Sequence, residues 1–235
     1  MTLALAAVAV AIGAAAQSIS GIGFALVSGP LLFTVFGARE GVRVAVVLSM
    51  LVNVAVLTRE HRSVMWRRVL PVLVTALAAT PLLVHVLADA HPRLLRAAAG
   101  AVIVLGAALV GSGRSADVGL PGGIAAGLAS ATMNVLASAG GPAVAVYATG
   151  ARWEPTGLRA TLQAYFLSLN VVTLLTLGPP HQDPGRLAIL AVALVIGALA
   201  GARMAPRLPT GVARVATLVL AAGGGIGVLV SALVG

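Results

Sequence analysis

The sequence contains no cysteine, so disulfide bonds, thiolate metal sites and catalysis by a cysteine nucleophile are excluded. Charged residues are also scarce: they make up 9% of the 235 residues, against about 25% in an average soluble domain. Hydrophobic residues make up 60%, and the mean hydropathy is +1.07. This composition predicts an integral membrane protein that is in contact with the lipid bilayer over much of its surface.

Acidic residues are few, and none lies at the centre of an apolar segment. A proton relay across a membrane needs titratable groups at depth, and a site for a hard cation needs carboxylate oxygens. The sequence therefore argues against proton coupling through an intramembrane carboxylate, and no metal or other cofactor is expected. The acidic residues are Glu40, Glu60, Asp89, Asp117, Glu154 and Asp183.

All 15 basic residues are arginine, and they lie in or beside short gaps between apolar segments. This placement is typical of membrane topology signals, so nucleic acid is not expected as a partner. Ten arginines lie in the alternate gaps 58–68, 113–118, 151–159 and 203–214, and five lie in the other gaps. The positive-inside rule predicts a multi-pass protein of the cell membrane whose ten-arginine face is cytoplasmic and whose termini are both outside.

Ten apolar segments predict an all-α membrane fold of about ten helical segments. A full crossing needs about 20 residues, and two segments, 22–37 and 139–150, are shorter. We interpret these two either as short tilted helices or as arms of hairpins that turn back within the membrane. The ten segments are 2–19, 22–37, 41–58, 67–88, 93–112, 119–137, 139–150, 156–178, 185–204 and 210–234.

An internal repeat divides the chain into halves at 1–112 and 119–235, joined by a linker at 113–118. Several short stretches recur in the same order, 112 to 118 residues apart. The matched stretches are Ser28–Pro30 with Gly140–Pro142, Phe36–Arg39 with Thr149–Arg152, Leu51–Val54 with Ser168–Val171, and Arg96 with Arg214. Because each half has five segments, the second half is predicted to enter the membrane inverted. Inverted repeats are a recurrent device of secondary transporters, whose substrate site lies where the halves meet.

Helix-breaking residues mark one place in each half. Gly21, Gly23 and Pro30 interrupt the first half, and Gly140, Gly141 and Pro142 interrupt the second. Non-helical backbone at membrane depth is tolerated only where protein buries it or where it lines a cavity. Helices that start after such breaks present free N–H groups, which favour anions. The alternative is that the glycines only permit close packing of helices.

Neutral polar residues cluster near these breaks. Asn53 and Asn170 occupy matching places in the repeat, and a buried amide needs partners. They are interpreted either as substrate contacts or as structural clamps on the broken segments. Hydroxyls such as Ser138 can instead bond helix carbonyls, and Arg159 can either reach an anion path or extend to the interface. The polar residues at depth are Gln17, Ser18, Ser20, Ser28, Ser49, Asn53, Ser130, Thr132, Asn134, Ser138, Thr161, Gln163, Tyr165, Ser168 and Asn170.

Three stretches, Gly21–Leu32, Ser138–Pro142 with Tyr147, and Leu158–Thr161, resemble the TauE/SafE sulfite exporter family, also called the toluene sulfonate uptake permease family. The resemblance covers essentially the whole chain and implies a carrier of sulfite, sulfoacetate or related organosulfonates. Ser138 departs from the family pattern, which often has glycine at that place. By position, the resemblance implies a site at Gly21, Gly23, Phe24, Ser28, Pro30, Gly140, Gly141, Pro142 and Arg159.

The leading hypothesis from the sequence is a secondary transporter that exports a small sulfur-containing anion by alternating access. An importer of such anions, or a membrane assembly subunit without transport, is the alternative; assembly into a homo-oligomer is left open. An enzyme is not expected, because no acid, base or metal ligands converge at depth. The complete candidate site is Gly21, Gly23, Phe24, Ser28, Pro30, Asn53, Ser138, Gly140, Gly141, Pro142, Arg159 and Asn170.

Overall fold

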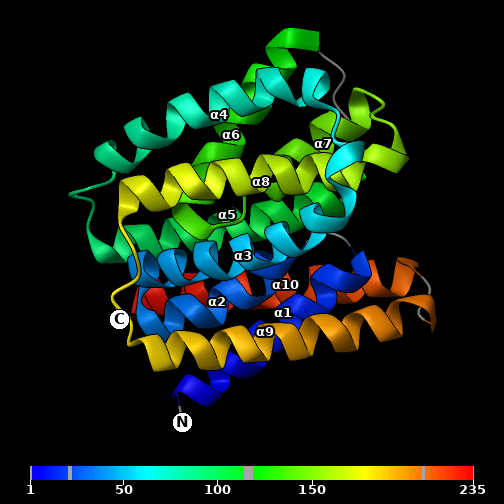
Figure 1. Ribbon diagram of the computed structural model, residues 1–235. Coiled ribbons are helices and arrows are strands. Elements are labelled where there is room, and N and C mark those ends of the chain that lie inside the picture. Colours follow the sequence, from blue (N-terminus) through cyan, green and yellow to red (C-terminus); the bar gives the residue numbers. More distant parts are fainter. Residues whose placement is uncertain (1, 21–22, 114–118, 208–209, 235) are drawn as a thin grey trace.

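The computed structural model describes residues 2–20, 23–113, 119–207 and 210–234. Within these ranges the chain is all-helical, with ten α-helices and no strand (Figure 1). This confirms the predicted fold class. The helices are α1 (Thr2–Ser20), α2 (Phe24–Phe36), α3 (Ala38–Glu60), α4 (Trp66–Val86), α5 (Pro92–Gly111), α6 (Gly119–Ala137), α7 (Gly141–Gly150), α8 (Pro155–Leu177), α9 (Pro184–Met204) and α10 (Thr210–Val234). Two short 3₁₀ helices follow α3 and α9, at His61–Ser63 and Ala205–Arg207.

Seven of the described helices are long and apolar enough to cross a membrane: α3, α4, α5, α6, α8, α9 and α10. The chain is therefore a multi-pass membrane protein. Helix α2 has 13 residues, which at 1.5 Å per residue gives about 20 Å, less than the roughly 30 Å hydrocarbon core. Helix α7 is shorter still, with 10 residues. Neither short helix can cross a bilayer alone.

Both short helices turn back along the helix before them. Gln17 near the end of α1 meets the first residue of α2, Phe24, and Gly13 lies against Ser28, one turn further along α2. In the second half, Ser130 of α6 meets Gly140 at the start of α7. The short apolar segments thus have the hairpin arrangement, which was one of the two interpretations that their length allowed.

The long helices lie beside one another, so that their ends gather at two ends of the molecule (Figure 1). The principal pairs are α1 with α9, α5 with α10, α4 with α6, and α3 with α8. Glycines permit close approach in these contacts: for example, a Cβ atom at Gly127 of α6 would lie 2.6 Å from the Val72 carbonyl oxygen of α4. In the bilayer, such close approach supplies the van der Waals contact that holds helices together.

Charged residues that the sequence assigned to one face also lie near one another in the structure. Arg68 is 3.3 Å from Glu154 across the α4–α8 contact, and both residues come from the predicted ten-arginine face. At the opposite end, Arg43 pairs with Glu40 at 3.2 Å and donates to the Leu177 carbonyl at the end of α8. These charged pairs lie at the two ends of the bundle, away from its middle.

The close α4–α6 contact generates a stability prediction. Gly127→Ala places a methyl group against the Val72 carbonyl, and overpacking of this kind costs about 1–3 kcal/mol. The matched control is Gly223→Ala on α10, where an added Cβ meets nothing within 4 Å. Thermal unfolding of the purified protein in detergent should show a lower midpoint for Gly127→Ala and an unchanged or higher midpoint for Gly223→Ala. Equal midpoints would contradict the packing described here.

Candidate functional site

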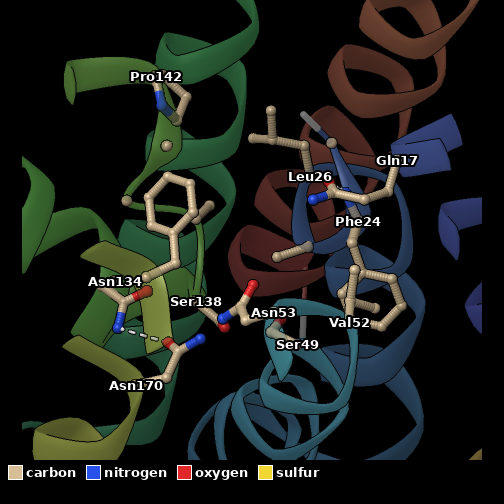
Figure 2. Close-up of a pocket in the computed structure, with 16 residues that line it drawn as sticks. Gln17, Phe24, Leu26, Ser49, Val52, Asn53, Asn134, Ser138, Pro142 and Asn170 are labelled. Atoms are coloured by element: carbon tan, nitrogen blue, oxygen red, sulfur yellow. Dashed lines mark hydrogen bonds between the residues drawn. The ribbon is translucent and has the colours of Figure 1, made fainter. Parts of the chain in front are cut away.

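A pocket lies where the two broken hairpins, α1–α2 and α6–α7, face the middle of α3 and α8 (Figure 2). It contains about 490 Å³ of space not occupied by atoms, including space open to the surroundings. The residues that line it are Gln17, Gly23, Phe24, Ala25, Leu26, Ser49, Val52, Asn53, Asn134, Ser138, Ala139, Gly140, Gly141, Pro142, Phe166 and Asn170.

The first break is shaped by Gly23 and closed by Gln17. Gly23 has φ 132°, a conformation that glycine adopts far more readily than other residues. Directly after it, the backbone N–H of Phe24 donates to Oε1 of Gln17 at 3.0 Å. A glutamine from α1 therefore satisfies one of the free N–H groups at the start of α2. Residues 23–30 are all buried, as non-helical backbone and its flanks must be at membrane depth.

The second break has a different construction. Ser138 adopts φ 53°, the left-handed conformation in which many helices end. The Ala139 N–H then bonds back to the Met133 carbonyl at 3.3 Å, which closes α6. One residue later, the Ser130 hydroxyl donates to the Gly140 carbonyl at 2.8 Å. A Cβ atom at Gly140 would lie 2.6 Å from that hydroxyl oxygen, so only glycine fits this turn.

A buried amide network ties α6 to α8 at the edge of the pocket. Nδ2 of Asn134 donates to Oδ1 of Asn170 at 3.2 Å and to the Thr173 hydroxyl at 3.0 Å. Figure 2 shows the first of these bonds as a dashed line. All three side chains are buried. The network therefore holds the Asn170 side chain in place, with its Oδ1 accepting a hydrogen bond from Asn134.

Two other buried polar groups of the pocket have no hydrogen-bond partner among the described residues: Nδ2 of Asn53 and Oγ of Ser138. Asn53 is 3% exposed and Ser138 is 7% exposed. Leaving such a group unpaired costs about 1–3 kcal/mol, and native structures rarely leave one without a reason. These two atoms are therefore the clearest candidates for contact with a ligand.

The described lining of the pocket carries no arginine, histidine, aspartate or glutamate. Its polar groups are neutral: four amide side chains, two serine hydroxyls and the backbone at two helix starts. Free N–H groups at a helix start favour negative charge. The arrangement suits a small anion held by neutral hydrogen-bond donors.

Eight residues of the sequence-derived candidate site line this pocket: Gly23, Phe24, Asn53, Ser138, Gly140, Gly141, Pro142 and Asn170. Gly21 lies outside the described residues. The other three candidates are described but lie elsewhere, and their contacts explain why.

Ser28 is buried inside α2, where its hydroxyl donates to the Phe24 carbonyl at 2.7 Å. Pro30 lies inside the continuous helix α2, so the prediction that it interrupts the apolar segment is wrong. It packs against α10, close enough that a Cβ at Gly224 would lie 2.7 Å from its ring. The Arg159 side chain is 52% exposed near the start of α8, where it lies 3.8 Å from Glu60. These three residues thus have structural contacts away from the pocket.

Sequence reasoning did not place Gln17, Ser49, Asn134 or Phe166 in the site, although the first three were recognised as polar residues at depth. A fixed spacing of 117 residues relates these residues to one another in two pairs, as it relates others in the pocket. It is the spacing between Asn53 and Asn170, and twelve of the sixteen lining residues form six pairs at this separation. The pairs are Gln17 with Asn134, Gly23 with Gly140, Phe24 with Gly141, Ala25 with Pro142, Ser49 with Phe166, and Asn53 with Asn170.

The amide network gives a second prediction. Asn134→Ala leaves Oδ1 of Asn170 buried without its donor, which should cost about 1–3 kcal/mol of unfolding free energy. Thr132→Val on the same helix is the control, since its hydroxyl only bonds the Leu128 carbonyl one turn earlier. Denaturant unfolding in detergent, followed by tryptophan fluorescence, measures both. A control variant as unstable as Asn134→Ala would contradict a specific role for the network.

Comparison with known proteins gives one match. The model of the family described as sulfite exporter TauE/SafE matches residues 5–228, nearly the whole chain. No curated protein and no solved structure matches the chain.

Proposed function

The chain belongs to the sulfite exporter TauE/SafE family of membrane transporters, and from this membership and the chemistry of its pocket we propose that it exports a small sulfur-containing anion. Sulfite, sulfoacetate and related organosulfonates are the proposed substrates. The pocket between the two broken hairpins is the proposed transport site. The proposal includes no enzymatic step and no cofactor.

The observation that carries this proposal is the combination of an uncharged pocket with unpaired buried donors. Nδ2 of Asn53 is a donor only, and the Ser138 hydroxyl can donate as well. A sulfur oxyanion offers several oxygen atoms that accept hydrogen bonds from such donors. Its transport requires neither a metal ion nor a catalytic acid or base. Because the described lining contains no carboxylate, nothing in it repels a negative charge.

Alternating access is the proposed mechanism, with residues 1–112 and 119–235 as the two halves. Helices α6 and α8 begin 117 residues after α1 and α3, respectively. The helix contacts also correspond between the two halves. Helix α1 packs on α9 as α6 packs on α4, and α2 packs on α10 as α7 packs on α5. This correspondence supports two related halves, and inverted halves support rocking about a site at their interface.

In this proposal the direction of transport follows from the membrane potential. The positive-inside rule puts the end with Arg68 and Arg159 in the cytoplasm. A monovalent anion that leaves a cell with a negative interior gains about 2.3 kcal/mol per 100 mV. Export would then proceed down the membrane potential without a coupling ion, which agrees with the absence of titratable side chains from the described lining.

Transport can be tested with the purified protein in proteoliposomes loaded with radiolabelled sulfite. We expect efflux above that of protein-free vesicles, and faster efflux when a potassium gradient with valinomycin makes the interior negative. Ser49→Phe fills the pocket from α3 and should reduce efflux to the protein-free rate. Thr176→Phe, at an exposed position of α8, is the matched control and should leave efflux unchanged.

The alternatives predict other outcomes. Accumulation of sulfite against an interior-negative potential, driven by an inward proton or sodium gradient, would identify an importer in the cell. Efflux that ignores the potential but depends on a proton or sodium gradient would contradict the uncoupled mechanism. A folded preparation that moves no sulfite, sulfoacetate or other organosulfonate would overturn the transporter proposal in favour of an assembly subunit.

A further inference from the structure

We propose that the pocket selects anions of a single negative charge, and that Asn53 and Ser138 hold the anion's oxygens while Asn134 and Asn170 serve as a fixed structural clamp. This inference rests on the proposed function, since it takes the pocket as the transport site. It narrows the proposed substrates by charge: hydrogen sulfite and monosulfonates meet the rule, whereas sulfoacetate, whose carboxylate adds a second negative charge, does not. It also assigns separate roles to amides that lie 117 residues apart.

The charge rule follows from what surrounds the pocket. The cost of moving an ion out of water rises with the square of its charge, and in a low-dielectric interior it is repaid only by counter-charges or good hydrogen bonds. The described lining offers no cation. Neutral amides, hydroxyls and helix N–H groups can stabilise one negative charge, but they leave a dianion largely uncompensated.

The division of roles follows from a difference between the halves. Asn53 and Asn170 are 117 residues apart and both line the pocket, and so do Gln17 and Asn134. In the second half, Asn134 donates to Oδ1 of Asn170. In the first half, the longer Gln17 instead accepts from the Phe24 backbone N–H. Asn53 consequently has no amide partner, and its Nδ2 remains available.

The position of Ser138 completes the binding group. Its backbone N–H donates to the Asn134 carbonyl at 2.7 Å, whereas its buried hydroxyl has no hydrogen-bond partner among the described residues. Asn53 on α3 and Ser138 after α6 both line the pocket, and Figure 2 labels both side chains there. In this proposal, one anion with two free oxygens bridges the two hairpin regions through these two groups.

An apolar side accompanies the polar side. Phe24, Leu26, Val52 and Phe166 also line the pocket, and they provide contact for a short carbon substituent. Methanesulfonate, with one charge and one methyl group, is therefore the appropriate probe of the charge rule. Sulfate and ethane-1,2-disulfonate are the doubly charged comparisons of similar chemistry.

Binding to the detergent-purified protein tests the charge rule without requiring transport. We expect radiolabelled methanesulfonate to bind saturably, and sulfate and ethane-1,2-disulfonate to compete about a hundred-fold more weakly or worse. Competition by either dianion as strong as that of unlabelled methanesulfonate would overturn the inference. Binding of methanesulfonate without flux in proteoliposomes would support the inference and overturn the proposed transport; absence of binding by all three anions would overturn the inference.

Sulfite itself supplies an independent readout, because lowering the pH converts the sulfite dianion to the hydrogen sulfite monoanion. Sulfite flux at constant total concentration should rise as the pH falls through this conversion, while methanesulfonate flux stays constant. Constant sulfite flux with active methanesulfonate transport would contradict selection by charge. The methanesulfonate series controls for any effect of pH on the protein.

The roles of the amides are tested by substitution. Asn53→Ala removes a hydrogen bond to a charged ligand and should weaken methanesulfonate binding about ten- to a hundred-fold, with an unchanged unfolding midpoint. Ser138→Ala should weaken binding in the same direction. Ser168→Ala on α8 is the control, since its hydroxyl only bonds the Ala164 carbonyl. Unaltered affinity in folded Asn53→Ala protein would overturn the assignment of Asn53.

Discussion

The fold depends on the requirement that backbone polar groups within a membrane be satisfied by the protein itself. Two breaks in apolar helices, at Gly23 and at Ser138–Gly140, create such groups. The protein satisfies them with side chains from the preceding helices: Gln17 accepts from Phe24, and Ser130 donates to Gly140. Once the breaks are satisfied in this way, a pocket lies between them.

Pocket residues that lie 117 residues apart differ in what they bond. The Asn134–Asn170–Thr173 network ties α6 to α8 at the pocket, whereas Nδ2 of Asn53 on α3 has no hydrogen-bond partner in the described part of the chain. In the proposed alternating-access mechanism, some contacts within each half must persist while others are made and released with the substrate. The bonded amides of α6 and α8 suit the first role, and the unpaired Nδ2 of Asn53 suits the second.

The sequence predicted much of this arrangement. The ten apolar segments agree with the ten helices because a membrane requires long apolar runs, and the two breaks were recognised because glycine and proline are conspicuous within them. The sequence could not separate residues that serve the pocket from those that serve packing. Ser28 bonds its own helix and Pro30 packs on α10, although both belong to the recognised motif. Gln17 and Asn134 were recognised only as buried polar residues, because their orientation depends on how the hairpins fold back.

The most direct test of the central claim, that the pocket between the two breaks holds the anion, is to locate a bound anion. Selenite is the selenium analogue of sulfite, and its anomalous scattering identifies its position in a crystal of the protein. The account predicts a selenium peak in the pocket, within hydrogen-bonding reach of Nδ2 of Asn53 and the Ser138 hydroxyl. Selenium peaks confined to the arginine-rich ends of the bundle, with the pocket empty, would contradict it.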